Sequence, residues 1–303
     1  MHPLNPPRIM KSNDAILTVC HRMPFSKTAA FVKSLNATEF AGQCHFFCSF
    51  CDDETVENLR RSNIDIHAFL FLARHVRQRL ATPWPLWRRF FAVPQPQWLA
   101  DAVSRRVLHL FYLRHLLYLR FLEQSPNVSR VLMCDCRDVY FQTDPFRDWP
   151  GDGLHAFEED RTTLIGDCEH HRRWISQLAP PGTLEKLTHF PRVCAGTIMG
   201  DRHSAIRFLR KMLEMTYAAD SLEPQDGDQG LFNILVHERR IEEIVVHRNS
   251  ESSVSTIGGT LGEKITTDSE GFVTCPNGRR VPILHQYDRK PDIAKPLLAR
   301  LGL

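Results

Sequence analysis

The residues best suited to chemistry lie in one short run, Cys134-Asp-Cys-Arg-Asp-Val-Tyr-Phe-Gln-Thr-Asp144, which contains three carboxylates. It follows Arg130-Val-Leu-Met133, a brief apolar run typical of a buried parallel strand. Ligands of open α/β sheets bind beyond the carboxyl ends of such strands. Clustered carboxylates there suit a hard divalent cation, which takes oxygen ligands and keeps open positions for phosphate oxygens. We therefore predict a metal site that contains Asp135 and Asp138.

The spacing of these two aspartates restricts the backbone. Side chains three positions apart on a continuous strand point to opposite faces and lie roughly 10 Å apart. The strand must therefore end or bend near Asp135 if both carboxylates bind one ion. Asp144 precedes Pro145-Phe146 and fits a turn better than a ligand position. The alternative for the whole cluster is a solvated turn at a strand end.

Two later segments carry further polar groups. Leu284-His-Gln-Tyr-Asp-Arg-Lys-Pro291 closes an apolar run with His285, and imidazole suits Mn²⁺ better than Mg²⁺. The alternative is a structural histidine. Asp226-Gly-Asp-Gln-Gly230 marks a turn that opens a helix, and Asp228 there could be either a catalytic group or a helix cap.

Hydrophobic patterns place these motifs in an α/β fold, a Rossmann-like, mostly parallel sheet flanked by helices. We expect a tail over 1–13 and one domain over 14–303, whose extension 249–303 folds back over the site. Residues 83–98 combine prolines with a heavy aromatic load and predict a packed loop, with a substrate lid or a membrane-contact patch as alternatives. The predicted strands are 15–20, 45–50, 64–72, 130–133, 154–157, 193–200 and 243–247, and the predicted helices are 26–35, 52–61, 101–123, 205–219 and 231–238.

Composition restricts the partners and the compartment. A net charge of +3 over 303 residues is too small to indicate a nucleic-acid partner. No apolar run approaches the ~18 residues of a membrane-spanning helix, and the first residues lack the apolar core of a signal peptide. We expect a cytoplasmic protein, with contact at the inner membrane surface left open. Nine cysteines, an odd number without a secreted-type framework, predict free thiols.

Taken together, the motifs resemble a known family. An Asp-x-Asp-type pair after a central strand, an Asp-Gln at a helix start some ninety residues on, and a late His followed by Lys-Pro are landmarks of the glycogenin-like retaining glycosyltransferases, which have the nucleotide-diphospho-sugar transferase (GT-A) fold. The resemblance implies Asp135, Asp138 and His285 as ligands of Mn²⁺ (or Mg²⁺). It further implies Lys290 as a donor-phosphate contact and the pair Asp228-Gln229 as catalytic residues.

Departures from that family point to a related branch. Here Cys136 and Arg137 separate the aspartates, where the family has one residue, and Arg137 could instead neutralise donor phosphate. His21-Arg22 stand where the family has an acidic nucleotide contact, and Asp292 replaces a tryptophan after the Lys-Pro. The run Asp-x-Arg-Asp-Val-Tyr-Phe-Gln-x-Asp-Pro-Phe is similar to less characterised bacterial and plant sugar transferases.

Other candidate contacts remain alternatives to structural roles. Arg120, on the helix before the carboxylate strand, either contacts the donor, as the resemblance implies, or extends its charge from the helix surface. His21 and Arg22 are candidate donor contacts by position. Glu158 and Glu159, followed by Asp160, end a predicted strand and are candidate acceptor contacts.

These observations predict a metal-dependent glycosyltransferase that moves a sugar from a nucleotide donor of the UDP or GDP type to a glycan or lipid-linked acceptor, with retention of configuration. Departure of a diphosphate builds up negative charge, which a metal and nearby cations stabilise without a nucleophile. The alternatives are a divalent-metal phosphoesterase and a catalytically silent glycan- or nucleotide-binding protein.

Cys48-x-x-Cys51 and the segment Cys168-Glu-His-His171 would suit zinc or redox chemistry, but Asp52-Asp53 would raise a thiol pKa, which disfavours a redox role.

Overall fold

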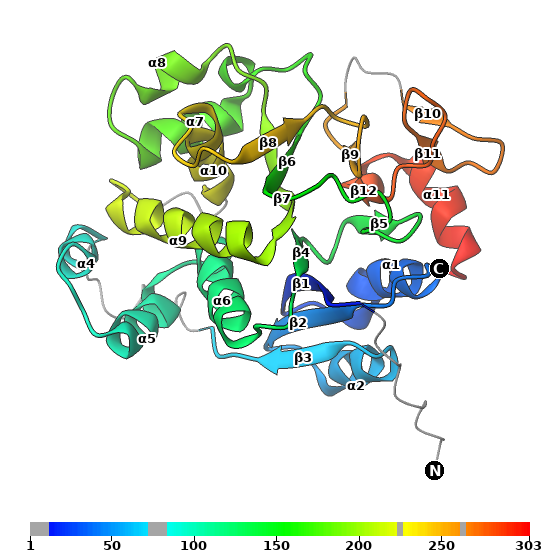
Figure 1. Cartoon of the computed structure of the whole chain (residues 1–303), viewed down its shortest axis with the longest axis horizontal. Coiled ribbons are helices and arrows are strands. Elements are labelled where there is room, and N and C mark those ends of the chain that lie inside the picture. Colours follow the sequence, from blue (N-terminus) through cyan, green and yellow to red (C-terminus); the bar gives the residue numbers. More distant parts are fainter. Residues whose placement is uncertain (1–11, 72–83, 223–226, 261–264) are drawn as a thin grey trace.

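The fold centres on a seven-stranded sheet in the computed structural model, which describes residues 12–71, 84–222, 227–260 and 265–303. The strand order is β3-β2-β1-β4-β7-β6-β8, and β7 alone runs antiparallel to both of its neighbours (Figure 1). The mostly parallel sheet predicted from the sequence is thus confirmed. The strands are β1 (Asp14–His21), β2 (Gln43–Ser49), β3 (Asp65–Ala68), β4 (Arg130–Cys134), β6 (Leu154–Glu158), β7 (Val193–Asp201) and β8 (Ile244–His247).

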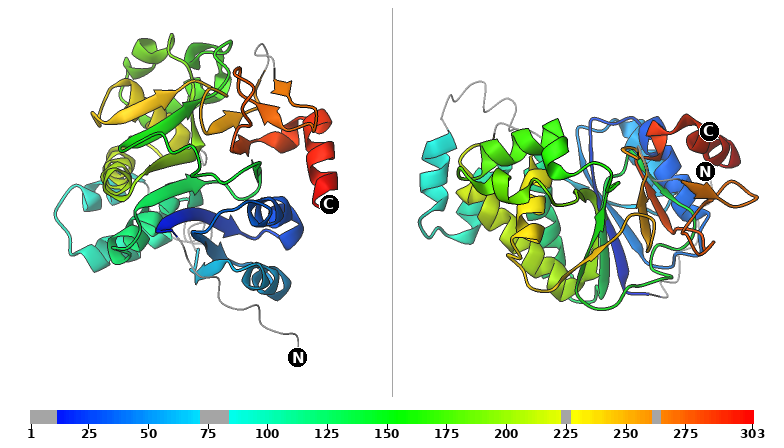
Figure 2. Two further views of the ribbon diagram at one scale, coloured as in Figure 1. Left: turned by 45° about the vertical axis from the view of Figure 1, so that its right-hand side comes forward. Right: turned by 90° about the horizontal axis from the view of Figure 1, so that it is seen from above.

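Helices cover both faces of this sheet (Figure 2). Val131 and Met133 of β4 join the apolar core under α6, α9 and α10, while the intervening Leu132 joins the core under α1. Because both faces are buried, β4 reads as a continuous apolar run instead of an alternating one. The helices are α1 (Phe25–Asn36), α2 (Asp53–Arg61), α4 (Trp84–Phe91), α5 (Gln97–Val107), α6 (Leu110–Gln124), α7 (Glu169–Leu178), α8 (Thr183–Leu187), α9 (Arg202–Ala218), α10 (Asp228–His237) and α11 (Pro291–Arg300).

The C-terminal part of the chain adds a second sheet beside the first. β12 (Ile283–His285) pairs antiparallel with β5 (Val139–Phe141) and parallel with β9 (Val254–Thr256), so His285 lies opposite Val139. The backbone N–H of Gln286 then donates to the carbonyl of Asp138 at 2.7 Å. This pairing brings the end of the chain to the acidic run. A short hairpin of β10 (Thr266–Thr267) and β11 (Val273–Thr274) lies beyond it.

Two predictions of local structure were wrong. The helix expected over 101–123 is two helices, because the backbone is extended at Leu108 and His109 and α6 starts afresh at Leu110. The loop expected over 83–98 contains the helix α4, whose Trp84 Nε1 donates to the carbonyl of Ala219 at 2.8 Å. Phe91 of α4 stacks on Tyr217 of α9 at 4.1 Å, so this aromatic segment packs against the body of the protein.

Within the described residues, no helix combines the length and the apolar character needed to cross a bilayer.

Candidate active site

The acidic run leaves the sheet where the sequence requires it to. β4 ends at Cys134, and the N–H of Asp135 donates to the carbonyl of Gly196 at 3.0 Å before the chain turns through residues 136–138. The predicted end of the strand near Asp135 is therefore confirmed. Asp144 occupies a turn, where its Oδ1 accepts from the N–H of Phe146 at 2.9 Å.

Asp135, Asp138 and His285 converge at this point. One ligand atom from each lies within 4.8 Å of the others. His285 Nε2 is 3.7 Å from Asp135 Oδ2 and 3.6 Å from Asp138 Oδ1. The other ring nitrogen, Nδ1, faces Cys194 Sγ at 3.3 Å and Thr256 Oγ1 at 3.4 Å, which fixes the ring so that Nε2 points at the carboxylates.

This group fits a divalent cation. Among the described residues, Asp138 Oδ1 and His285 Nε2 are buried polar atoms without a hydrogen-bond partner. Burying such atoms unpaired is costly, and a cation bound between them would satisfy both. Two carboxylates with one imidazole suit Mn²⁺ better than an all-oxygen set would, although Mg²⁺ also accepts carboxylates.

The electrostatics of the three side chains are coupled. Burial raises the pKa of Asp138 above its usual range. Burial also opposes ionisation of Asp135, but His285 and Arg114 outweigh it and lower the pKa of that carboxyl. Burial lowers the pKa of His285, but Cys194 and the two aspartates have a larger opposite effect. The pKa of the imidazole is therefore well above its ordinary value. The two carboxylates therefore favour the protonated form of the imidazole.

Arg114 connects this group to the other half of the site. It lies on α6, and its guanidinium donates from Nη1 to Asp135 Oδ1 at 2.8 Å and from Nη2 to Asp228 Oδ2 at 2.6 Å. Nη2 also donates to the carbonyl of Ala195 at 3.1 Å. Asp228 lies in the first turn of α10, where Gly227 is the capping residue, so its carboxylate serves this ion pair instead of the helix N-terminus.

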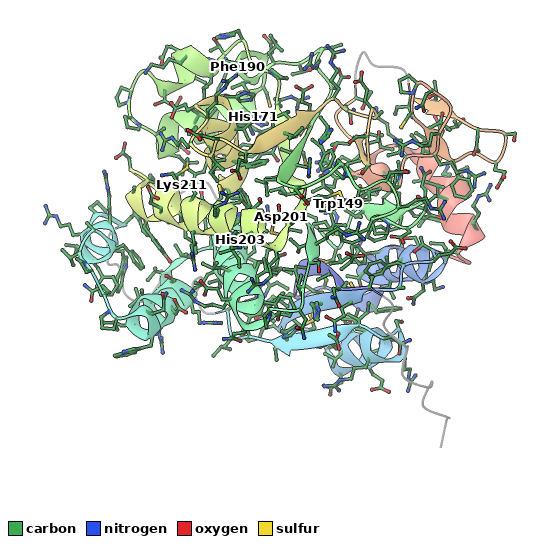
Figure 3. All side chains as sticks on the ribbon, viewed as in Figure 1. Trp149, His171, Phe190, Asp201, His203 and Lys211 are labelled. Atoms are coloured by element: carbon green, nitrogen blue, oxygen red, sulfur yellow. The ribbon has the colours of Figure 1, made fainter. Side chains whose placement is uncertain are left out.

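Gln229, the next residue, begins a second polar network. Its Nε2 donates to Glu159 Oε1 at 2.7 Å and to Nε2 of His171, on α7, at 3.1 Å. Arg192 pairs with Glu159 at 2.7 Å. Burial lowers the pKa of His171, which Figure 3 labels, to about 4, so this ring is neutral at neutral pH and can accept from Gln229.

Both groups line one cavity of about 570 Å³. Its wall also contains Arg137, whose exposed guanidinium pairs with Asp288 at 3.0 Å, and Arg289. The remaining lining residues include apolar and aromatic side chains, namely Val19, Met23, Leu110, Phe111, Tyr118 and Trp174. A concave surface on which polar groups converge beside apolar and aromatic side chains is typical of a ligand site.

Several predicted contacts lie outside this cavity lining. Arg120 pairs with Asp101 at 2.7 Å and with Glu123 at 2.5 Å, so it supports α5 and α6. Lys290 donates to the carbonyl of Thr260 at 2.8 Å. The three remaining predicted contact residues also have partners outside the cavity lining. His21 packs on Phe71, Arg22 lies over Phe50, and the buried carboxylate of Glu158 pairs with Arg161.

Sequence reasoning missed Arg114, Arg192, Cys194 and Gly196. Arg114 carried a usable signal, because a cation in the most apolar stretch of a helix needs a buried acidic partner. Gly196 carried none in the sequence. A Cβ built there would lie 2.6 Å from His285 Nε2 and 2.7 Å from Asp135 Oδ2, so only glycine lets these two side chains approach.

Neither a protein-family model nor a curated protein sequence matches this chain. Among solved structures, the chain is similar to the galactosyltransferase LgtC in complex with donor and acceptor sugar analogues, at a TM-score of 0.51 and 15% identity over 95% of each chain. An active-site mutant of LgtC aligns over 89% of this chain and 86% of its own, at a TM-score of 0.47 and 14% identity. The protein thus has the GT-A fold of nucleotide-diphospho-sugar transferases, as the sequence predicted.

The ion pairs of Arg114 lead to a first prediction. Arg114→Met should lower the free energy of unfolding by about 3–5 kcal/mol, because it leaves the buried carboxylate of Asp228 without its cation. Arg88→Met, which removes an exposed pair with Asp220, should cost no more than about 1 kcal/mol. Urea denaturation of both variants measures the two costs. Equal losses would contradict the central role given to Arg114.

A second prediction concerns Gly196. Gly196→Ala should weaken Mn²⁺ binding at least 10-fold, because the new methyl group displaces His285 or Asp135. Gly259→Ala is the matched control, since it lines the same cavity but its Cβ meets nothing closer than 3.8 Å. Calorimetric titration with MnCl₂ gives both affinities. Unchanged Mn²⁺ affinity in Gly196→Ala would contradict the assignment of the cation to the site between Asp135 and His285.

Proposed function

We propose that this protein is a metal-dependent glycosyltransferase that transfers a sugar from a nucleoside-diphosphate donor, of the UDP or GDP type, to a glycan or lipid-linked acceptor. The observation that carries the proposal is a single cavity lined by two groups: a carboxylate–imidazole set suited to a cation, and the Asp228-Gln229 pair. The LgtC complex with donor and acceptor sugar analogues, which shares the fold, supports the same class of substrates.

The diphosphate would bind at the acidic end of the cavity. A cation held by Asp135, Asp138 and His285 would neutralise negative charge as the diphosphate departs. Arg137 and Arg289 line the same cavity and can donate to phosphate oxygens. Phosphate would compete with Asp288 for the exposed guanidinium of Arg137, and an exposed pair of this kind costs little to exchange.

The reacting sugar would lie beside Asp228 and Gln229. Arg114 pairs with the Asp228 carboxylate and fixes its position, so a negative charge there could stabilise an oxocarbenium-like sugar. The amide of Gln229 is oriented by Glu159 and His171. Retention of configuration is part of the proposal and rests on the resemblance of these motifs to retaining transferases.

The acceptor would approach along Glu159, Arg192 and Trp174. Glu159 is fixed by Arg192, and the indole N–H of Trp174 is a buried donor without a protein partner among the described residues. The ring of Trp174 lines the cavity and could cover an apolar sugar face. Glu158 is paired with Arg161 and is not part of this surface.

The proposed domain is a single catalytic unit over 14–303 with the extension 249–303 over the site. This arrangement is supported by His285, which reaches the acidic run through the pairing of β12 with β5. Nine free cysteines suit a reducing compartment, which supports the proposed cytoplasmic location. Contact with the inner membrane surface remains part of the proposal.

The two rival functions make different demands on the site. A phosphoesterase of this type normally holds two ions. Within the described ranges, one carboxylate–imidazole group is present, and the other candidate metal group consists of thiols. A silent binding protein would need the nucleotide contacts but not the buried, fixed Asp228.

A third prediction tests the function directly. Purified protein with Mn²⁺ should release nucleoside diphosphate from one or more sugar nucleotides in a UDP and GDP panel. Asp138→Asn and His285→Asn should each lower that rate at least about 100-fold, because each removes a group that stabilises the leaving charge. Asp144→Asn is the matched control, since it lies in the same run but serves a turn whose hydrogen bond an amide can keep.

The outcomes separate the three functions. Full activity in both Asp138→Asn and His285→Asn would contradict the metal assignment. Cleavage of phosphomonoesters with sugar nucleotides left intact would establish the phosphoesterase instead. Tight nucleotide binding with neither reaction would establish the silent binding protein.

A further inference from the structure

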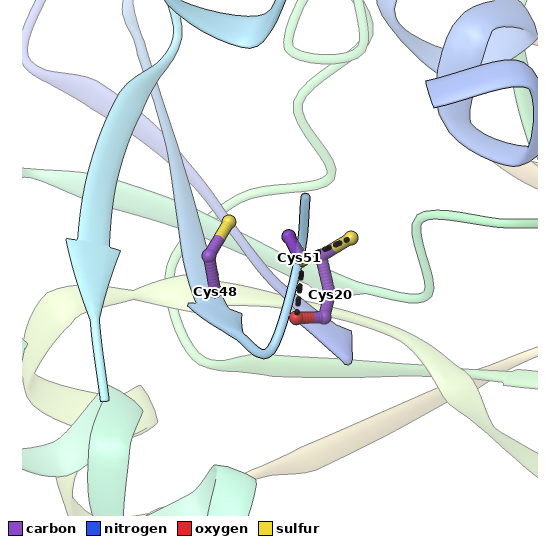
Figure 4. Close-up of side chains that lie close together, drawn as sticks. All are labelled: Cys20, Cys48 and Cys51. Carbon is purple, nitrogen blue, oxygen red and sulfur yellow. Dashed lines mark hydrogen bonds between the residues drawn. The ribbon is translucent and has the colours of Figure 1, made fainter. Parts of the chain in front are cut away.

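Three cysteine sulfurs meet at the carboxyl ends of two neighbouring strands (Figure 4). Cys20 and Cys48 are register partners and the last residues but one of β1 and β2, and Cys51 follows in the loop before α2. The three sulfurs lie within 4.8 Å of one another, and those of Cys20 and Cys51 are 3.6 Å apart. The sequence showed only the Cys48-x-x-Cys51 pair, and the third sulfur comes from the strand pairing.

The geometry of this cluster matches a tetrahedral thiolate site. Zinc binds cysteine sulfur at about 2.3 Å, which separates two sulfurs of a tetrahedral site by about 3.8 Å. Cys20 and Cys48 are buried, whereas Cys51 is half-buried. A zinc ion bound by three thiolates would take a water molecule as its fourth ligand.

We propose that Cys20, Cys48 and Cys51 form a zinc site, separate from the carboxylate–imidazole group of the cavity. Thiolates are soft ligands that select zinc, whereas carboxylates favour the harder cations. Zinc would bind three thiolates, and each sulfur that was protonated would release its proton to solvent. No electron transfer is involved.

The cysteine cluster lies beside one wall of the cavity. Val19 and Met23 flank Cys20 on the chain and both line the cavity. Cys51 Sγ lies 3.5 Å from the carbonyl of Cys20, and Thr55 of α2 donates to the carbonyl of Met23 at 3.4 Å. Zinc would therefore join the end of β1 to the start of α2 and stiffen this wall of the cavity.

A fourth prediction follows for the full-length protein, stripped of metal under reducing conditions. Titration with Co²⁺ should produce a sulfur-to-cobalt charge-transfer band that Zn²⁺ abolishes by competition. The band reports sulfur ligation, so Co²⁺ in the carboxylate–imidazole group does not contribute to it. His285→Asn should keep the band in full, which separates this proposal from the proposed function.

Variants of single cysteines locate the site. Cys51→Ser and Cys48→Ser should each abolish the band or weaken Co²⁺ binding at least 10-fold. Cys44→Ser should leave it unchanged, since Cys44 is buried on the same strand but outside the cluster. Cys51 is the least buried of the three, so its variant tests the site even if Cys48→Ser fails to fold.

Two results would overturn the proposal. One is a reduced wild-type protein that binds Co²⁺ without the charge-transfer band. The other is a band that survives unchanged in Cys51→Ser.

Discussion

A buried guanidinium joins the two halves of the cavity. Arg114 pairs with Asp135 beside the proposed cation and with Asp228 beside the proposed sugar, at 2.8 and 2.6 Å. Removing such charges from water is costly, so the arrangement persists only because each charge meets an opposite one. The site therefore depends on α6, β4 and α10 keeping their relative positions. The two apolar cores around the sheet hold those elements in place.

The cation group depends on a second constraint, the return of the chain end to the acidic run. β12 pairs with β5, and this register places His285 beside Asp135 and Asp138, about 150 residues away along the chain. Gly196 leaves the space in which they meet, and Cys194 orients the imidazole. The backbone pairing of β12 with β5 thus positions the His285 imidazole beside the two carboxylates. Unpartnered ligand atoms in a buried place are the reason to expect an ion there.

Most of the sheet was predictable, because strand and helix patterns alternate and buried parallel strands read as apolar runs. The end of β4 at Cys134, just before Asp135, was predictable from the spacing of the two aspartates once both were taken to bind one ion. The apolar surroundings of Arg114 on its helix signalled a buried acidic partner, but the partners of Arg114 and Arg192 come from distant segments that local patterns do not show. The split between α5 and α6 was missed since the apolar pattern continues through Leu108, and only the backbone breaks. The ion pair of Arg120 with Asp101 of α5 was not predicted, and a donor contact of Arg120 stays a prediction.

The metal assignment is tested most directly by a crystal structure of the protein with Mn²⁺ and a nucleoside diphosphate, with the metal located by anomalous scattering. We expect an anomalous peak between Asp135, Asp138 and His285, and diphosphate oxygens that complete the coordination of the metal on the cavity side. A nucleotide bound in this cavity with no peak between those three side chains would contradict it.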